Sequence, residues 1–161
     1  MRGVVRVRAE GYVTDRRGCR HWGRLGAAGL LLRLQVADGP RYLLQQRAMW
    51  TDHGGTWSVP GGAMRPGESP FEAARREARE ELGALPALHH PRVMRDDHGG
   101  WCYHTVIADV GDRFVPSGGD GEGLATRWCT PGEIASLRLH PGFAATWPTI
   151  RGKLKELDTC G

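Results

Sequence analysis

Apolar residues along the chain fall into short runs separated by polar and glycine-rich segments, and most of these runs have the length of a β-strand. Residues 25–34 form a nearly continuous apolar run, which is typical of a strand buried on both faces. Residues 41–47 follow it after the turn signal Asp38-Gly39-Pro40, so the two runs are predicted to form a hairpin. Further strands are predicted within residues 56–60, 91–97, 101–110 and 124–130, with a glycine-rich loop at Gly61-Gly62 after the first of them.

Helical periodicity is clearest between Ser69 and Leu82. At ~100° per residue, one narrow stripe of this segment is apolar and is expected to face the core. The stripe consists of Phe71, Ala74, Ala78 and Leu82. Ser69 is a suitable N-cap, Pro70 suits the first helical position, and Glu72 completes a capping box.

Two more helices are predicted near the C-terminus, a short one from Pro131 and a longer one from Pro141 to Leu157. Residues 116–123 have the composition of a loop. Strands therefore come first, one helix lies in the middle, and helices close the chain. This order predicts an α/β fold in which a mixed β-sheet lies between helices.

Length and composition limit the possible classes of protein. With 161 residues, 40% of them hydrophobic, a single domain over residues 1–161 is expected. No stretch reaches the ~20 apolar residues of a membrane span, and the first residues lack a secretory signal, so a cytoplasmic protein without a membrane partner is expected. The oligomeric state is expected to be a monomer or a homodimer.

The net charge of +4 arises from 20 Arg and only 2 Lys, set against 18 acidic residues. No basic cluster is interleaved with aromatic residues, so no polynucleotide partner is expected. The four cysteines are widely scattered and form no C-x-x-C pair, which favours reduced thiols over a disulfide framework or a zinc site. They are Cys19, Cys102, Cys129 and Cys160.

The strongest chemical signal is a cluster of acidic residues on the predicted helix at Ser69–Leu82. Glu77 and Glu81 are four residues apart, and Glu80 lies beside them on the same face. A solvated face with ion pairs to Arg76 is the ordinary explanation for such a segment. However, three neighbouring carboxylates repel one another unless cations lie between them, and Mg²⁺ prefers a few carboxylates together with substrate phosphates. We therefore interpret the cluster as a metal site.

This segment resembles the Nudix box, the family pattern G-x5-E-x7-R-E-U-x-E-E-x-G-U, where U is a bulky aliphatic residue. The fixed positions are matched by Gly62, Glu68, Arg76, Glu77, Glu80, Glu81 and Gly83. The two U positions hold Ala78 and Ala84, which are smaller than the usual residues. That departure concerns the packing of the helix and leaves the acidic positions intact.

The resemblance implies an enzyme that hydrolyses a diphosphate linkage with Mg²⁺, or alternatively Mn²⁺. Glu77, Glu80 and Glu81 would bind the metal with help from the backbone carbonyl of Gly61. Glu68 would pair with Arg76 and orient the glutamates. The candidates for the general base are Glu80, Glu77 and the loop residue Glu122, in that order. Arg76 itself is expected to be a surface ion-pair partner, so Arg76→Ala should lower activity and change stability by no more than about 1 kcal/mol.

Similarity to the MutT-type branch of the family, and to its actinobacterial members, extends over roughly residues 20–150. It implies a nucleotide as the small-molecule substrate, with an oxidised purine nucleotide such as 8-oxo-dGTP cut to the monophosphate. Arg47 matches a basic residue that contacts substrate in such enzymes. The asparagine that reads the oxidised purine is replaced near Gly142 and Phe143, where the Phe143 ring and backbone groups from His140 onwards are candidates for holding the base.

Two alternatives remain open at this level. The box reads only the diphosphate and the metal, so the substrate of a Nudix hydrolase could equally be ADP-ribose or a nucleotide sugar. A Nudix-fold sensor that binds nucleotides without hydrolysing them is the non-enzymatic alternative. The complete set of glutamates argues against the sensor, because a binding module has no need for all of them.

Overall fold

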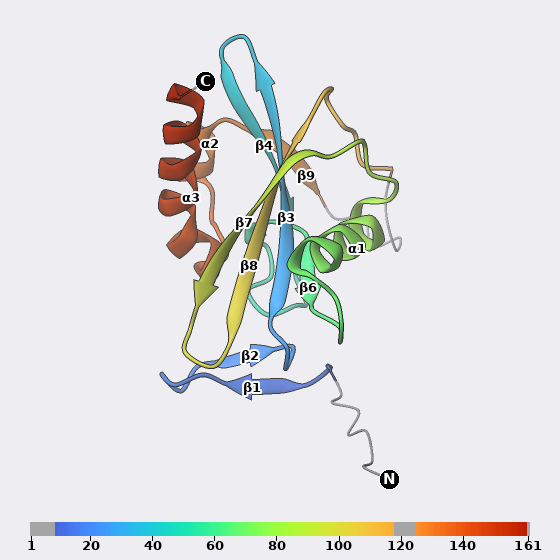
Figure 1. Ribbon diagram of the computed structural model, residues 1–161, viewed down its shortest axis with the longest axis vertical. Helices are drawn as coiled ribbons and strands as arrows, with labels where there is room; N and C mark the ends of the chain where they lie inside the picture. The colour runs from blue at the N-terminus through green and yellow to red at the C-terminus, as the bar shows by residue number, and fades with distance from the viewer. Residues whose placement is uncertain (1–8, 118–124, 161) are drawn as a thin grey trace.

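The computed structural model describes residues 9–117 and 125–160 (Figure 1). Seven strands form the main sheet, in the order β5-β4-β3-β8-β7, with β6 and β9 attached to β3 and β4. They are β3 (Ala27–Val36), β4 (Gly39–Gln46), β5 (Trp57–Ser58), β6 (Gly61–Ala63), β7 (His89–Asp97), β8 (Cys102–Val110) and β9 (Thr126–Cys129). The pair β3–β8 is parallel and the other pairs are antiparallel, so the sheet is mixed as predicted.

Helices cover both faces of this sheet (Figure 1). Helix α1 (Pro70–Leu82) lies on one face, and α2 (Pro131–Ser136) and α3 (Pro141–Thr159) lie on the other. Strand β3 is buried on both sides because Leu30 and Leu32 pack toward α1 while Leu31 packs toward α3. The predicted α/β fold, with a mixed sheet between helices, is confirmed.

Helix α1 begins where the sequence predicted it. Ser69 is the N-cap and accepts a hydrogen bond from the Glu72 amide, while the Glu72 carboxylate accepts one from the Ser69 amide. The apolar stripe faces the core, and Ala74, Ala78 and Leu82 are completely or almost completely buried. The small residue at position 78 therefore lies directly against the sheet.

Two elements differ from the sequence-based expectation. A hairpin of β1 (Tyr12–Thr14) and β2 (Arg20–Trp22) was not predicted, because its aromatic residues Tyr12 and Trp22 remain half exposed and create no alternating buried face. Gly61-Gly62, expected in a loop, belong to strand β6. β6 can pair with β3 here because Gly61 has no side chain, and a Cβ on it would lie only 2.6 Å from the Ala28 carbonyl oxygen.

The described residues contain no helix long and apolar enough to cross a membrane. All four cysteines have free thiols, and only Cys129 is buried. The free thiols agree with the expectation that the cysteines are reduced.

Candidate active site

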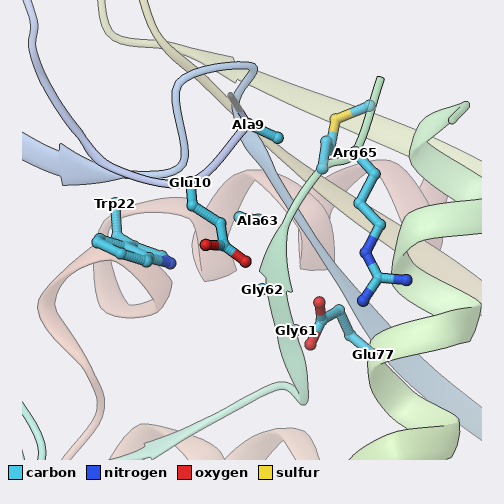
Figure 2. Close-up of a pocket in the computed structure, with 9 residues that line it drawn as sticks. Ala9, Glu10, Trp22, Gly61, Gly62, Ala63, Arg65 and Glu77 are labelled. Atoms are coloured by element: carbon cyan, nitrogen blue, oxygen red, sulfur yellow. The ribbon is translucent and has the colours of Figure 1, made fainter. Parts of the chain in front are cut away.

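The acidic cluster lies on the face of α1 that adjoins β6. Glu77 points to the backbone of β6, and its carboxylate occupies the space beside Gly62 (Figure 2). An ideal Cβ on Gly62 would lie 2.6 Å from the carboxyl carbon of Glu77, so only glycine leaves room for the carboxylate in this position. The glycine that opens the sequence pattern and a glutamate fifteen residues later are therefore in direct contact.

Arg76 connects the members of this cluster. Its guanidinium donates to both oxygens of Glu68 at 2.6 and 3.0 Å, and to the Ala63 carbonyl at 3.0 Å. It also donates to Glu77 and lies 3.6 Å from Glu80. The Arg76 side chain is only 17% exposed, so it belongs to a largely buried network, and the expectation of a simple surface ion pair is wrong.

Glu68 anchors this network to the loop before α1. Its carboxylate accepts a further hydrogen bond from the Arg65 amide at 2.8 Å. The hydrogen bonds from Arg76 hold the pKa of Glu68 below its usual range, so the group is an anion at neutral pH. The predicted pairing of Glu68 with Arg76 is present, and it fixes the guanidinium that in turn orients Glu77.

The other two glutamates have different surroundings. Glu80 is half exposed, and its nearest cations are Arg76 at 3.6 Å and Arg65 at 3.9 Å. Glu81 reaches toward the sheet, and its carboxylate accepts a hydrogen bond at 3.1 Å from the side-chain amide (Nε2) of Gln45 on β4. Glu80 is thus the member of the trio that is most open to solvent, whereas Glu77 and Glu81 are held in place by neighbours.

Tyr103 on β8 is a site residue that the sequence analysis missed. Its hydroxyl lies over two glycines, 2.2 Å from an ideal Cβ on Gly29 and 3.0 Å from one on Gly61. Burial raises the pKa of Tyr103, and the nearby carboxylates of Glu81 and Glu77 raise it further while Arg47 opposes them. The phenol is therefore neutral and lies within the field of the acidic cluster. A glycine inside an apolar strand signals such a close approach, but does not say from where it comes.

The donor set suits a hard divalent cation. Glu77, Glu80 and Glu81 offer carboxylate oxygens, and Gly61 offers a backbone carbonyl beside the glycine cradle of Gly62. Mg²⁺ and Mn²⁺ are bound by oxygen ligands of this kind. Arg76 offsets part of the negative charge, and the remaining charge is available to a metal.

Arg47 directly follows β4, and its charge is felt by both Tyr103 and His140. Its Nε donates to the Asp52 carbonyl at 2.9 Å. Two histidines share this region: His140 is the N-cap of α3 and accepts from the Gly142 amide at 3.1 Å, and the His53 ring lies edge-on to it at 4.8 Å. Burial lowers the pKa of His140 to about 4, with Arg47 and His53 adding to the effect. The structure thus gathers Arg47 with His140, and adds His53, which sequence reasoning did not single out.

Phe143 does not lie in this open region. Its side chain is 5% exposed and packs in the core beneath α3, with its ring centroid 5.8 Å from that of Trp147. A ring held in this way cannot stack on a base without displacing core neighbours, so the structure makes Phe143 a core residue. The other loop candidate, Glu122, lies outside the described residues.

A hollow of about 610 Å³ opens between α1 and the β1–β2 hairpin (Figure 2). Glu77 and Arg65 form the side that belongs to the box, and Trp22 and Glu10 form the opposite side. Strand β6 lies between the two sides and carries Gly62. The acidic cluster therefore borders a cavity large enough to admit part of a nucleotide-sized molecule.

Comparison with known proteins shows to which family the chain belongs. A family model described as the NUDIX domain matches residues 24–150. The chain belongs to the Nudix family. This Nudix chain is 43% identical over 157 residues to a Mycobacterium tuberculosis protein named "Putative 8-oxo-dGTP diphosphatase 3", covering 91% of this chain and 71% of that protein. The chain is a Nudix pyrophosphohydrolase, and it is similar to mycobacterial proteins named as a diphosphatase and as a Nudix hydrolase.

Two further relatives agree with this assignment. A Nudix hydrolase from M. smegmatis, RenU, has a crystal structure that matches with a TM-score of 0.78 and 41% identity, covering 91% of this chain and 95% of that chain. A Bifidobacterium longum protein, named a nucleoside triphosphate pyrophosphatase/Nudix hydrolase fusion protein, is 36% identical over 156 residues. The match covers 93% of this chain but only 32% of the fusion protein, so that protein carries further sequence outside the shared Nudix part.

Proposed function

We propose that this Nudix hydrolase uses Mg²⁺, or Mn²⁺ in its place, to cut an oxidised purine nucleoside tri- or diphosphate of the 8-oxo-dGTP type to the monophosphate. The observation that carries the proposal is the position of the Glu77 carboxylate against Gly62, with Glu80 and Glu81 beside it on α1. The 8-oxo-dGTP in the name of the mycobacterial relative supports the substrate class.

The roles of the residues follow from their contacts. Glu77, Glu80 and Glu81 would hold the cation, with the Gly61 carbonyl as a further oxygen ligand. When bound, such a cation neutralises the diphosphate and makes a bound water more acidic. Arg76 and Glu68 keep the Glu77 carboxylate in one orientation, which avoids the cost of ordering it during the reaction.

Glu80 is our first choice for the general base. A general base must be reachable by the attacking water, and a hydrogen bond from a guanidinium makes a carboxylate a weaker base. Glu80 is half exposed, and the nearest guanidinium nitrogen lies 3.6 Å away, whereas Glu77 accepts a direct hydrogen bond from Arg76. Glu77 is the second candidate and Glu122 the third.

Arg47, with His140 beside it, is our candidate for contacting the nucleotide. A guanidinium at the end of β4 can pair with a phosphate or with a carbonyl on the base. The backbone at the start of α3, beyond the Gly142 amide that His140 already caps, is our candidate for hydrogen bonds to the purine edge, while Phe143 contributes by supporting that helix from the core. A site built on such polar groups can reject an unmodified purine strongly.

A substrate panel tests the proposal. Values of kcat/KM with Mg²⁺ would be compared for 8-oxo-dGTP, dGTP, ADP-ribose and a nucleotide sugar. We expect 8-oxo-dGTP to be preferred over dGTP and over both conjugates. Preference for ADP-ribose or the sugar would leave the hydrolase in place and overturn the oxidised-purine substrate. Binding without turnover of any compound would favour a sensor.

A further inference from the structure

Three side chains that could hold a metal ion, from residues outside the glutamate cluster, lie close together. They come from the β1–β2 hairpin and from the turn between β7 and β8, which lie side by side (Figure 1). Asp15 Oδ2 lies 2.8 Å from His21 Nε2 and 4.0 Å from His98 Nδ1. All three ligand atoms lie within 4.8 Å of one another. The sequence does not predict this group, because His98 lies 77 positions after His21.

Asp15 and His98 are each oriented by a second contact, and the inward-facing Asp15 Oδ2 shares a hydrogen bond with His21 Nε2 that a bound metal ion would replace. The other carboxylate oxygen of Asp15 accepts from the amides of Arg17 and Cys19 at 2.8 and 2.9 Å. The far nitrogen of His98, Nε2, lies 2.8 Å from the Asp96 carboxylate. A histidine that pairs one nitrogen with a carboxylate and offers the other inward is the usual arrangement behind a metal ligand.

The framework around the group is also fixed. The His21 ring stacks on Trp101 at 4.1 Å with an interplanar angle of 7°, and Trp101 Nε1 donates to the Gly23 carbonyl at 2.8 Å. The Arg16 amide donates to the Gly99 carbonyl at 2.9 Å, which ties the two turns together. The ligand side chains are shielded, with exposures of 1% for Asp15, 16% for His21 and 24% for His98.

We propose that Asp15, His21 and His98 form a second metal site, selective for Zn²⁺, that fastens the β1–β2 hairpin to the sheet. Two imidazole nitrogens and one carboxylate oxygen suit Zn²⁺, with water as the fourth ligand, and suit Mg²⁺ poorly. Ligand atoms around tetrahedral Zn²⁺ lie about 3.4 Å apart when the bonds are ~2.1 Å long. The two separations from Asp15, 2.8 and 4.0 Å, lie on either side of that value, and the two histidine nitrogens lie within 4.8 Å of each other, so small side-chain adjustments would complete the site.

The site has a consequence for the hollow beside the box. Trp22 follows His21 directly on β2, and it lines the side of the hollow that faces Glu77. Fastening His21 therefore fixes the wall that carries Trp22. The Zn²⁺ site is separate in chemistry from the oxygen-only glutamate set, and it does not depend on the proposed hydrolysis.

Zn²⁺ itself is the probe for the test. Binding would be measured by calorimetry in excess Mg²⁺, added to compete for the glutamate cluster, for the full chain and for the variants His98→Gln and His21→Gln. His89→Gln, at an exposed histidine on β7, is the matched control. We expect one Zn²⁺ to bind to the wild type and to the control, with affinity reduced about 100-fold or more in the other two variants.

Thermal unfolding and Co²⁺ spectra provide independent measurements. Zn²⁺ at 100 times its Kd is expected to raise the Tm of the wild type by about 5 °C or more, and to leave that of His98→Gln unchanged. Co²⁺ in the wild type is expected to give the intense visible bands of a tetrahedral nitrogen-containing site. No Zn²⁺ binding to the wild type in excess Mg²⁺ would overturn the proposal. Equal Zn²⁺ binding by folded His98→Gln and His21→Gln would overturn it as well.

Discussion

The carboxylate of Glu77 fills the space that a side chain on Gly62 would need, at 2.6 Å from an ideal Cβ to the carboxyl carbon. Gly62→Ala should therefore displace the carboxylate while leaving the fold in place, because a carboxylate is the end of a flexible side chain. We expect kcat with Mg²⁺ to fall about tenfold or more, since correct positioning of charge dominates such sites. Gly152→Ala is the control, because a Cβ there meets no atom within 4 Å. Normal turnover in Gly62→Ala would show that the contact is unimportant.

Arg76 should contribute to stability as well as to activity. Its truncation leaves Glu68 and Glu77, both largely shielded from solvent, without their cation. We expect Arg76→Ala to lower the free energy of unfolding by about 2 kcal/mol or more, on the scale of charged hydrogen bonds. Urea denaturation measures this change in the free energy of unfolding. The matched variant Arg65→Ala removes an exposed arginine 3.9 Å from Glu80 and should change stability by less than about 1 kcal/mol. Equal effects of the two substitutions would contradict a special role for Arg76.

The variant Phe143→Ala distinguishes a role of this ring in the core from a role in stacking on the base. Because its ring is buried against Trp147, Phe143→Ala should lower the free energy of unfolding by about 3 kcal/mol or more. Denaturant unfolding and steady-state kinetics on the same samples provide the comparison. Unchanged stability combined with a large rise in KM for 8-oxo-dGTP would instead place the ring in the base pocket.

His140 should make stability depend on pH. The folded protein keeps this histidine neutral down to its lowered pKa of about 4, whereas the unfolded chain protonates it near 6.5. The unfolded state binds more protons between these values, so the stability contribution is complete above pH 6.5 and is lost as the pH falls toward 4.

His140→Asn tests this dependence without removing the cap. Asparagine can still accept the hydrogen bond from the Gly142 amide at the start of α3, but it does not titrate. Denaturation curves at pH 7.5 and pH 5 should show a smaller loss of stability for the variant than for the wild type. An identical pH dependence of the two proteins would contradict the assignment.

The sequence predicted the parts of the site that depend on local spacing. The start of α1 at Pro70, its capping box and the shared face of Glu77 and Glu81 all follow from neighbouring residues, and the structure shows each of them. The same holds for the hairpin of β3 and β4, which a short turn connects.

Contacts between segments that are far apart in the chain could not be predicted from the sequence. Tyr103 reaches the glutamates only because β8 runs parallel to β3, which places it opposite Ala27. The β1–β2 hairpin depends in part on the hydrogen bond from Trp101 to the Gly23 carbonyl, across 78 positions. The pairing of Arg76 with Glu68 was expected, but the shielding of Arg76 was underestimated because its hydrogen bond to the Ala63 carbonyl comes from β6, outside the helix. Periodicity describes one element at a time and gives no information on such pairings.

The most direct measurement of the central claim is kcat with saturating Mg²⁺ and 8-oxo-dGTP for Glu77→Gln, Glu80→Gln and Glu81→Gln, beside Glu72→Gln. Glu72 lies on the same helix but serves only its cap. Loss of a ligand charge removes stabilisation of the transition state, so Glu81→Gln should lower kcat by roughly 10² or more, while Glu72→Gln should stay near the wild type. Near-normal turnover in all three ligand variants would contradict the claim, because the glutamates would then form only a solvated face of the helix.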